Sequence, residues 1–411
     1  MMMGDRIHAP QIRFSGFSDD WEQRKLGEIA NMHARIGWQN LRTSEFLDSG
    51  EYMLITGTDF QDGKIDYSKV HYVEKERYEQ DKKIQILNGS ILITKDGTIG
   101  KVAYVENLPM KATLNAGVFN LTVVDDINTS SLYLYHYLKG PFLLRFVNKE
   151  STGGTIKHLN QNVLVKFPIP LPSYREQLKI SSFLTNIDKL ITLHQCKLDK
   201  LINIKKSMLE KMFVEKNTDV PEIRFKGFTD TWEQRKLGEV ASVSMCKRIY
   251  KNQTLIEGDI PFYKIGTFGG TPDSFISREL YEEYKSKYPY PNKGDILISA
   301  SGSIGRTVEF TGKDEYFQDS NIVWLNHNEN ILNIFLKYFY LIVKWDGIEG
   351  TTIKRLYNEN ILKTEISFPS ITEQERIGQF FEKLDKLITL HQRKLEKLKN
   401  IKTSCLEKMF V

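Results

Sequence analysis

Apolar residues recur every three or four positions along two stretches of the chain, and this rhythm predicts two long helices. The first stretch, from Glu176 to Phe213, contains neither Pro nor Gly, and Pro172 separates it from earlier elements. At about 1.5 Å per residue, each helix would be roughly 55 Å long. Because the rhythm lasts for about four to five heptads, we expect the two helices to pair as a coiled coil. The predicted seam positions are Ile180, Leu184, Ile187, Ile191, Leu198 and Leu201 in the first stretch and Ile377, Phe381, Leu384, Ile388, Leu395 and Leu398 in the second.

Two polar positions interrupt this seam in the same way in both helices. One is occupied by His194 and His391, the other by Lys205 and Lys402. One interpretation is that these residues fix the register of the pair, as buried polar residues in coiled coils do. The other is that they lie at the edge of the seam and are solvated. The histidines have no second ligand at a suitable spacing, so the sequence predicts no metal site there.

The chain consists of two related halves. Pro10–Ala30 matches Pro221–Ala241 at 16 of 21 positions, and Pro172–Val214 matches Pro369–Val411 at 28 of 43 positions. The residues between these shared blocks are much less alike. Two equal structural halves would not need that contrast, so we expect the two interiors to recognise different things.

The first shared block of each half contains a tryptophan, Trp21 or Trp232, followed by the polar sequence EQRK. Asp19 and Glu22 have the spacing of a capping box, and the second copy has the same spacing, so the sequence predicts a short helix here. We expect the tryptophan to anchor this helix to a core.

The interiors are predicted to contain mixed strands and helices. Ile91–Thr94 and Ile296–Ser299 are short apolar runs that end in a glycine turn, which is typical of strands. Ser131–Val147 and Asn333–Trp345 are predicted to be amphipathic helices rich in aromatic residues. We expect these aromatic side chains in a core, and the alternative is a platform for the stacking of nucleic-acid bases.

The glycine turn after each strand is the main small candidate site. Glycines allow backbone N–H groups to converge on an anion, and a cation follows directly in both copies. The turn has two interpretations: contact with a nucleic-acid phosphate, or a tight strand connection that needs positive φ. The candidate DNA-contacting residues are Gly97, Gly100 and Lys101, their counterparts Gly302, Gly305 and Arg306, and Lys157 and Lys354 in the repeated TIK segments.

Composition limits the class of protein. A chain of 411 residues suggests two or three domains, and 40% hydrophobic with 27% charged residues is an ordinary globular balance that excludes a mainly disordered chain. A net charge of +5 permits a nucleic-acid partner without requiring one. The three cysteines are scattered, which fits a reducing cytoplasm better than a disulfide framework. We expect no secretory signal and no membrane span, and therefore a cytoplasmic protein.

Catalytic motifs are missing from the sequence. The segment Gly97–Lys101 lacks the spacing of a P-loop, and no GxGxxG, HExxH or GxSxG motif is found. The proline-flanked aromatic tetrapeptide of amino-methyltransferases is also missing. We therefore expect no catalytic residue, no metal site and no cofactor in this chain.

The shared blocks, the different interiors and the proline-to-Glu-Gln entry of each long helix form a specific combination. The entries run from Pro172 to Gln177 and from Pro369 to Gln374. In this combination, over nearly its whole length, the chain resembles the specificity subunit of a type I restriction–modification system.

The resemblance implies an α+β fold with an internal pseudo-two-fold. Two mixed α/β target recognition domains, 1–172 and 216–369, would be joined by two long antiparallel coiled-coil helices, 173–215 and 370–411. Each domain would read one part of a split, asymmetric site in double-stranded DNA. The chain itself would not be catalytic. Two modification subunits would supply S-adenosylmethionine-dependent adenine methylation, and two restriction subunits would supply cleavage that uses ATP and Mg.

Two other classes of function remain as alternatives. A coiled-coil scaffold that binds only proteins would explain the long helices but not the different interiors. A self-sufficient enzyme with an unrecognised site would show nuclease or methyltransferase activity without any partner.

Overall fold

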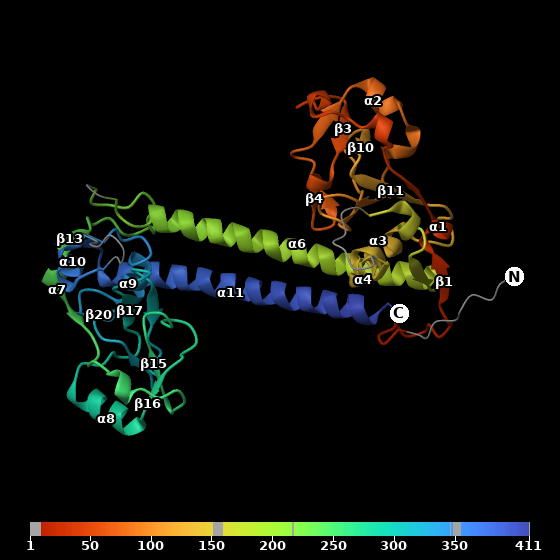
Figure 1. Ribbon diagram of the computed structural model, residues 1–411. Coiled ribbons are helices and arrows are strands. Elements are labelled where there is room, and N and C mark those ends of the chain that lie inside the picture. Colours follow the sequence, from red (N-terminus) through yellow and green to blue (C-terminus); the bar gives the residue numbers. More distant parts are fainter. Residues whose placement is uncertain (1–9, 151–158, 216–217, 346, 348–354, 411) are drawn as a thin grey trace. The chain divides into compact units, whose positions relative to one another are not determined.

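The computed structural model describes residues 10–150, 159–215, 218–345, 347 and 355–410 (Figure 1). The chain divides into two compact units. Unit 1 comprises residues 1–195 and 393–411, and unit 2 comprises residues 196–392. This division differs from the four expected segments, because each unit combines one of the two mixed α/β regions with one part of each long helix.

The two long helices are α6, Tyr174–Lys211, and α11, Ile371–Lys408 (Figure 1). In unit 1, Asp188 of α6 pairs with Lys402 of α11, and in unit 2, Lys205 of α6 pairs with Asp385 of α11. Residue numbers that rise along α6 therefore fall along α11. The prediction of two long antiparallel helices that pack together is confirmed.

The predicted seam positions of both helices face inward. Eight of them are buried, namely Ile180, Leu184, Ile187, Leu198, Ile377, Phe381, Leu384 and Leu395. Four are half-buried, namely Ile191, Leu201, Ile388 and Leu398. The polar seam residues His194 and His391 are also half-buried. The first seam residues of each helix belong to the core of a recognition domain, so the start of each helix is packed as part of that domain.

Unit 1 is built on two four-stranded sheets. The first has the strand order β2-β11-β8-β9 and is antiparallel, and the second has the order β6-β3-β10-β7 with a parallel β3–β10 pair. The strands are β1 Glu22–Lys25, β2 Ala30–His33, β3 Tyr52–Ile55, β4 Phe60–Gln61, β5 Lys64–Ile65, β6 His71–Val73, β7 Gln85–Ile86, β8 Ile91–Thr94, β9 Val102–Tyr104, β10 Ala112–Leu114, β11 Val118–Val123 and β12 Pro168–Leu171. The helices are α1 Leu26–Ile29, α2 Lys75–Glu79, α3 Ser131–Lys139, α4 Pro141–Glu150 and α5 Gln161–Leu164, with short 3-10 turns at Gly37–Gln39, Thr43–Glu45, Gly57–Asp59 and Lys82–Ile84.

Unit 2 has nearly the same topology, although its interior sequence differs. Among the described residues, its second sheet has no counterpart of β7 and it has no counterpart of the β4–β5 pair. Its sheets have the orders β14-β20-β17-β18 and β16-β15-β19, the second again with a parallel pair, β15–β19. The strands are β13 Glu233–Lys236, β14 Ala241–Ser244, β15 Ile260–Tyr263, β16 Phe275–Ile276, β17 Ile296–Ser299, β18 Thr307–Glu309, β19 Tyr316–Phe317, β20 Ile322–His327 and β21 Glu365–Phe368. The helices are α7 Leu237–Val240, α8 Arg278–Lys287, α9 Asn333–Phe339 and α10 Asn358–Lys363, with a 3-10 turn at Lys251–Gln253.

The repeated LEKMFV sequence contributes a methionine and a phenylalanine to the core of each unit. In unit 1, Met409 and Phe410 at the end of α11 are both 3% exposed and pack with residues of the first recognition domain. In unit 2, Met212 and Phe213 at the end of α6 are 3% and 4% exposed and pack with the second domain. The core of unit 1 is therefore completed by the far end of the sequence.

The polar sequence EQRK is a strand in both units, so the predicted helix there is wrong. β1 pairs antiparallel with β12, with Glu22 opposite Leu171, and β13 pairs with β21 in the same way. The helix begins only after these four residues, as α1 and α7. Pairing with a strand far along the chain outweighs the local capping-box signal, because propensity is weak against tertiary contacts. The prediction for Trp21 and Trp232 is confirmed, since they are 1% and 4% exposed.

The aromatic segments of the interiors are helical with different bounds from those predicted. Ser131–Val147 is divided into α3 and α4, because Gly140 ends the first helix and Pro141 begins the second. Asn333–Trp345 is helical only as α9. The prediction that their aromatic residues lie in a core is confirmed by the buried Tyr133, Tyr135, Tyr137, Phe335, Tyr338, Phe339 and Tyr340. The two apolar strands are confirmed as β8 and β17.

Candidate nucleic-acid interface and helix clasp

The glycine turn of unit 1 connects β8 to β9 and is closed by its own hydrogen bonds. Its glycines have positive φ, 68° at Gly97 and 77° at Gly100. The Gly100 N–H donates to the Thr94 carbonyl over 2.9 Å, and the Lys101 N–H donates to the Thr94 hydroxyl over 3.0 Å. The Thr94 hydroxyl in turn donates to the carbonyl of Thr98.

The glycine turn of unit 2 has the same geometry. φ is 66° at Gly302 and 78° at Gly305. The Gly305 N–H donates to the Ser299 carbonyl over 2.9 Å, and the Arg306 N–H donates to the Ser299 hydroxyl over 2.9 Å. Ser299 therefore has the role that Thr94 has in unit 1.

These contacts favour the strand-connection interpretation for the glycines. Two backbone N–H groups of each turn are already engaged, and a β-carbon at Gly100 would lie 2.6 Å from Leu144 Cδ2. The cations that follow the turns are exposed side chains, although Arg306 donates to the Gly269 carbonyl over 3.3 Å. A phosphate contact by Lys101 or Arg306 therefore depends on the side chain, and it stays a prediction.

The last residue of each TIK segment lies beside a glycine turn. Lys157 and Lys354 themselves lie outside the described residues. Just after them, the Leu159 N–H donates to the Lys95 carbonyl over 2.9 Å, and the Leu356 N–H donates to the Ala300 carbonyl over 2.8 Å. Because Lys95 and Ala300 directly precede the turns, the end of each TIK segment lies beside its turn.

Two exposed arginines of unit 2 were not predicted from the sequence. Arg355 forms a β-bridge with Ser301 of the turn. Arg248 is 57% exposed in its side chain and pairs with Asp319 over 2.8 Å. Arginine is the side chain that contacts guanine most often in the major groove. Arg355 could have been predicted as a candidate from the sequence, because it directly follows the predicted Lys354.

A bidentate ion pair, called the clasp below, joins the first shared block of each half to the start of a long helix. Arg13 Nε and Nη2 donate to the two carboxylate oxygens of Glu176, each over 2.8 Å. Arg224 makes the same two bonds to Glu373, each over 2.7 Å. The two carboxylate side chains are 1% and 2% exposed, so each is a buried charge with a bidentate partner.

The glutamine after each buried glutamate fixes the helix to its domain. Gln177 accepts from the Ser130 N–H over 2.9 Å and donates to the carbonyls of Pro172 and Asn128 over 2.9 and 3.1 Å. Gln374 makes the same bonds with Leu332, Pro369 and Asn330. The repeated Glu-Gln pair is therefore a structural feature of each helix entry.

The lysines that interrupt the seam form ion pairs between the two helices. Lys402 Nζ lies 2.5 Å from Asp188 Oδ1 in unit 1, and Lys205 Nζ lies 2.6 Å from Asp385 Oδ1 in unit 2. The interpretation of these lysines as solvated is therefore wrong. Each pair joins one fixed position of α6 to one of α11, which fits a role in register.

A buried polar residue lies next to each of these ion pairs. In unit 1 this is His136, whose Nε2 lies 3.0 Å from Thr185 Oγ1. Burial lowers the pKa of His136 to about 3, so the ring is neutral at neutral pH. In unit 2, Tyr338 donates instead to Asp385 over 3.0 Å.

Comparisons with known proteins identify the family. Residues 18–203 and 229–400 match the model of the type I restriction modification DNA specificity domain. The chain belongs to this family. A putative type I restriction enzyme specificity subunit of Haemophilus influenzae is 42% identical over 302 residues, which cover 72% of this chain and 75% of that protein.

Two further relatives extend over almost the full length of this specificity subunit. The putative MjaX specificity subunit of Methanocaldococcus jannaschii is 26% identical over 414 residues, covering 93% of this chain and 91% of that one. The crystal structure of a type I restriction-modification S subunit from M. genitalium superposes with a TM-score of 0.60 at 15% identity, covering 98% and 99% of the chains. The likeness in structure supports the fold.

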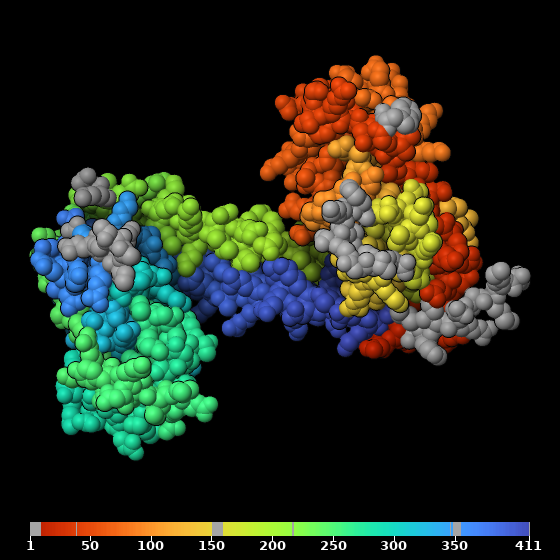
Figure 2. All heavy atoms as spheres, in the orientation of Figure 1, coloured from red at the N-terminus to blue at the C-terminus, as the bar shows by residue number. Residues whose placement is uncertain are grey.

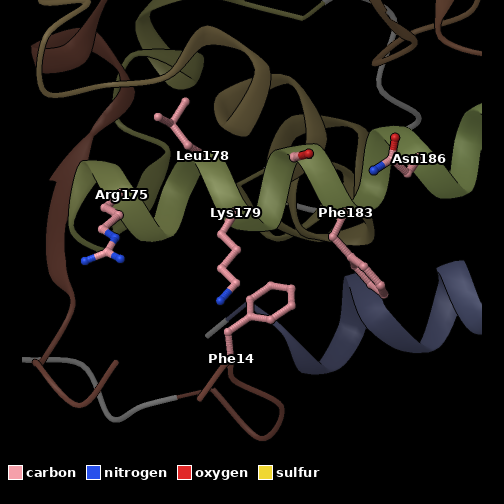
Figure 3. A pocket seen from close by; sticks show the side chains of 7 residues that line it. Phe14, Arg175, Leu178, Lys179, Phe183 and Asn186 are labelled. Carbon is pink, nitrogen blue, oxygen red and sulfur yellow. The ribbon is translucent and has the colours of Figure 1, made fainter. Parts of the chain in front are cut away.

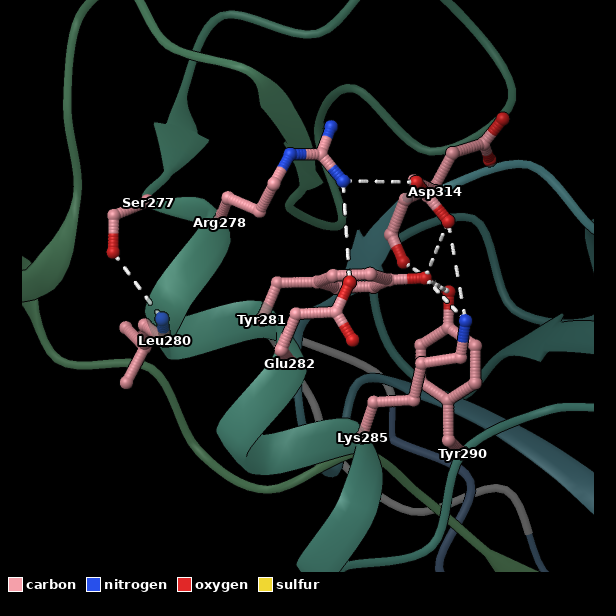
Figure 4. A network of polar contacts seen from close by, with 9 residues as sticks. Ser277, Arg278, Leu280, Tyr281, Glu282, Lys285, Tyr290 and Asp314 are labelled. Atoms are coloured by element: carbon pink, nitrogen blue, oxygen red, sulfur yellow. Dashed lines mark hydrogen bonds and ion pairs between the residues drawn. The ribbon is translucent and has the colours of Figure 1, made fainter.

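In unit 2 a polar network joins α8 to Asp314, which lies two residues before β19 of the three-stranded sheet (Figure 4). The Tyr281 hydroxyl donates to Asp314 over 2.9 Å, and Lys285 Nζ donates to the Tyr281 oxygen over 2.8 Å. Arg278 donates to the same carboxylate over 3.1 Å. The hydrogen bond from Tyr281, followed by that from Arg278, holds the pKa of Asp314 below its usual value. The network fixes a helix that belongs to the variable interior of the specificity subunit.

Two general features of the specificity subunit concern its described residues alone. Among them, no helix is long and apolar enough to cross a membrane. No group of three or more His, Cys, Asp or Glu side chains is placed to hold a metal ion within that same part of the chain.

Proposed function

We propose that this specificity subunit reads a split, asymmetric site in double-stranded DNA, with one unit reading each part. The observation that carries the proposal is the repeat of one topology with two different interiors. Each unit has its own sheets, core and glycine turn, while the interior sequences around the turns differ. Different side chains at equivalent places read different base edges.

In this proposal the chain directs chemistry that partner subunits perform. Two modification subunits methylate adenine with S-adenosylmethionine, and two restriction subunits cleave DNA with ATP and Mg. The chain itself is not catalytic. The support is the family, whose members are named specificity subunits of restriction enzymes, and the lack of any catalytic motif in the sequence.

The outer faces of the long helices supply a docking surface for the modification subunits. Leu190, Leu193 and Ile204 of α6 are 44%, 47% and 46% exposed. Their counterparts Leu387, Leu390 and Ile401 of α11 are 44%, 45% and 37% exposed. Stretches of both helices are uncovered on the face that Figure 2 shows. A helix with apolar residues at 3/4 spacing on a second face is suited to bind a further helix.

Sequencing of methylated bases in cells with and without the gene tests the proposal, in a strain that supplies the partner subunits. The expected result is one split adenine-methylation motif that disappears with the gene. An unchanged set of adenine motifs would contradict it. The purified chain is expected to show no nuclease or methyltransferase activity on its own.

The alternative is a scaffold that binds only proteins. It is favoured by the exposed leucines but gives no reason for the different interiors. A complex of the chain with its modification subunits is expected to bind duplex DNA with an affinity that falls steeply as salt rises. A complex that forms normally but binds no DNA would favour the scaffold.

A further inference from the structure

A shallow, open pocket with a volume of about 470 Å³ lies beside α6 in unit 1 (Figure 3). The start of α6 forms one side of it, and the segment before Trp21 forms the other. Phe14, Arg175, Leu178, Lys179, Phe183 and Asn186 line it. It therefore lies within unit 1 and away from the glycine turn.

The clasp joins the second side of the pocket to the start of α6. The ion pair of Arg13 with Glu176 fixes the neighbouring Phe14, whose ring meets Phe183 edge-on at 5.7 Å between centroids. The Lys179 ammonium lies 5.1 Å from the centre of the Phe14 ring. Figure 3 shows the Lys179 side chain extending toward this ring. A preformed pocket of this kind binds a partner without an ordering cost.

The lining combines an apolar surface with two positive charges. Leu178 is 46% exposed, and Phe14 and Phe183 add aromatic surface beside it. Arg175 and Lys179 place a guanidinium and an ammonium group at the rim. The complementary ligand is an apolar side chain flanked by carboxylates, since a carboxylate near these cations gains from Coulomb attraction.

The equivalent place in unit 2 has the same frame but a different lining. Phe225 meets Phe380 at 5.9 Å, and Arg376 lies 5.3 Å from the Phe225 ring. At the positions of Arg175, Leu178 and Asn186, however, unit 2 has Thr372, Glu375 and Lys383. Glu375 accepts a hydrogen bond from Gln379 over 3.0 Å and puts a negative charge where unit 1 has a leucine.

The pocket continues into the docking surface of the long helix. Lys179, Phe183, Asn186, Leu190 and Leu193 follow one another at spacings of four, three, four and three residues along α6. Residues at these spacings lie along one face of a helix. A helix bound on Leu190 and Leu193 can therefore extend into the pocket.

We propose that the pocket binds an acidic, amphipathic helix of the modification subunit, and that unit 1 is therefore occupied before unit 2. This inference rests on the proposed docking of modification subunits on the long helices. The two docking places share their leucines but differ in the pocket. In unit 2, Arg376 and Lys383 are also cations, but Glu375 offsets one of them, whereas the lining of unit 1 contains no carboxylate. Carboxylates are therefore attracted less strongly in unit 2, so the second modification subunit binds more weakly than the first.

Site-specific cross-linking tests which unit is occupied first. Single cysteines are introduced by S182C in the pocket of unit 1 or by Q379C at the equivalent place in unit 2, both with C196S to remove the exposed native thiol. Each variant carries a photo-cross-linker and receives half an equivalent of the purified modification subunit. The expected yield of adduct is about tenfold higher at position 182 than at position 379.

A matched pair of substitutions gives the control. L178E is expected to weaken the first binding step about tenfold, and E375L to strengthen the second by a similar factor, as measured by native mass spectrometry of the 1:1 and 1:2 complexes. With both changes, the preferred position of cross-linking is expected to move to 379.

The outcomes separate this inference from the function on which it rests. Equal yields at both positions, with complexes still formed, overturn the order of occupation and leave the docking intact. No complex at either position overturns the docking as well. Adducts between two copies of this chain at position 182 assign the pocket to self-association and overturn the proposal.

Discussion

Single buried charges hold each long helix to its recognition domain. The bidentate pair of Arg13 with Glu176, and its copy Arg224 with Glu373, are built from residues that the two halves share. The sequence shows that these residues are repeated but does not predict that they pair. Arg13 and Glu176 lie 163 positions apart, and no local pattern joins them. The same limit applies to Arg248, whose ion-pair partner Asp319 lies 71 positions away.

Arg13→Ala is expected to lower the stability of unit 1 by about 3 kcal/mol. The cause is the Glu176 carboxylate, which would stay buried without its partner. Hydrogen exchange in α3 and the start of α6 measures the loss. The control is Arg24→Ala, which breaks an exposed pair with Glu22 and is expected to change stability by less than about 1 kcal/mol. Equal effects of the two variants would contradict a structural role for the clasp.

His136 is expected to make unit 1 sensitive to acid. Burial lowers its pKa from 6.5 to about 3, so between these values the unfolded chain binds a proton that the folded chain does not. Stability from this group is therefore present above pH 6.5 and falls as the pH drops, by about 2 kcal/mol at pH 5. Melting curves at pH 7 and pH 5 measure the effect, which His136→Tyr is expected to remove and the exposed His71→Gln to leave. The same pH dependence in the His136→Tyr variant would refute this assignment.

Lys101→Ala and Arg306→Ala are expected to weaken DNA binding by the complex with modification subunits. Each removes one cation next to a glycine turn, so the slope of log affinity against log salt is expected to fall by about one. The loss should be similar for all sequences if the contact is to phosphate. Binding is measured by fluorescence anisotropy at several salt concentrations, with exposed Lys75→Ala as the control. Unchanged slopes in both variants would remove these residues from the interface.

Elements that show a long internal period can be predicted from this sequence. The 3/4 rhythm predicted both long helices, whose observed bounds are Tyr174–Lys211 and Ile371–Lys408. The four residues of EQRK have no such period, and their partner strand lies more than a hundred residues away, so their pairing was missed. The pocket beside Phe14 could not be predicted for the same reason, since its two sides meet only in the fold.

The last residues of α11 are expected to stabilise the domain at the other end of the sequence. Phe410 is 3% exposed and lies 5.5 and 5.3 Å from the rings of Tyr133 and Tyr137. Phe410→Ala is therefore expected to cost about 3 kcal/mol in unit 1. Hydrogen exchange should speed up in α3 and stay unchanged in α9 of unit 2. The counterpart Phe213→Ala should reverse this pattern, and a change in α9 alone after Phe410→Ala would contradict the packing.

At the scale of the whole molecule, the two halves share their flanking sequence blocks and differ in the interiors between them. The shared blocks form the clasps, the long helices and the ends that fill each core, and the interiors form the sheets and turns around them. This division of roles explains how two interiors of unlike sequence have one topology. It also makes the central claim testable, because an interior should be exchangeable without loss of the shared frame.

The most direct test replaces residues 242–368 with the matching interior of another family member and maps methylated adenines in cells that supply the partner subunits. We expect a new split motif in which one part is unchanged and the other is that of the donor. A motif in which both parts change would contradict the claim that each unit reads its own part of the site.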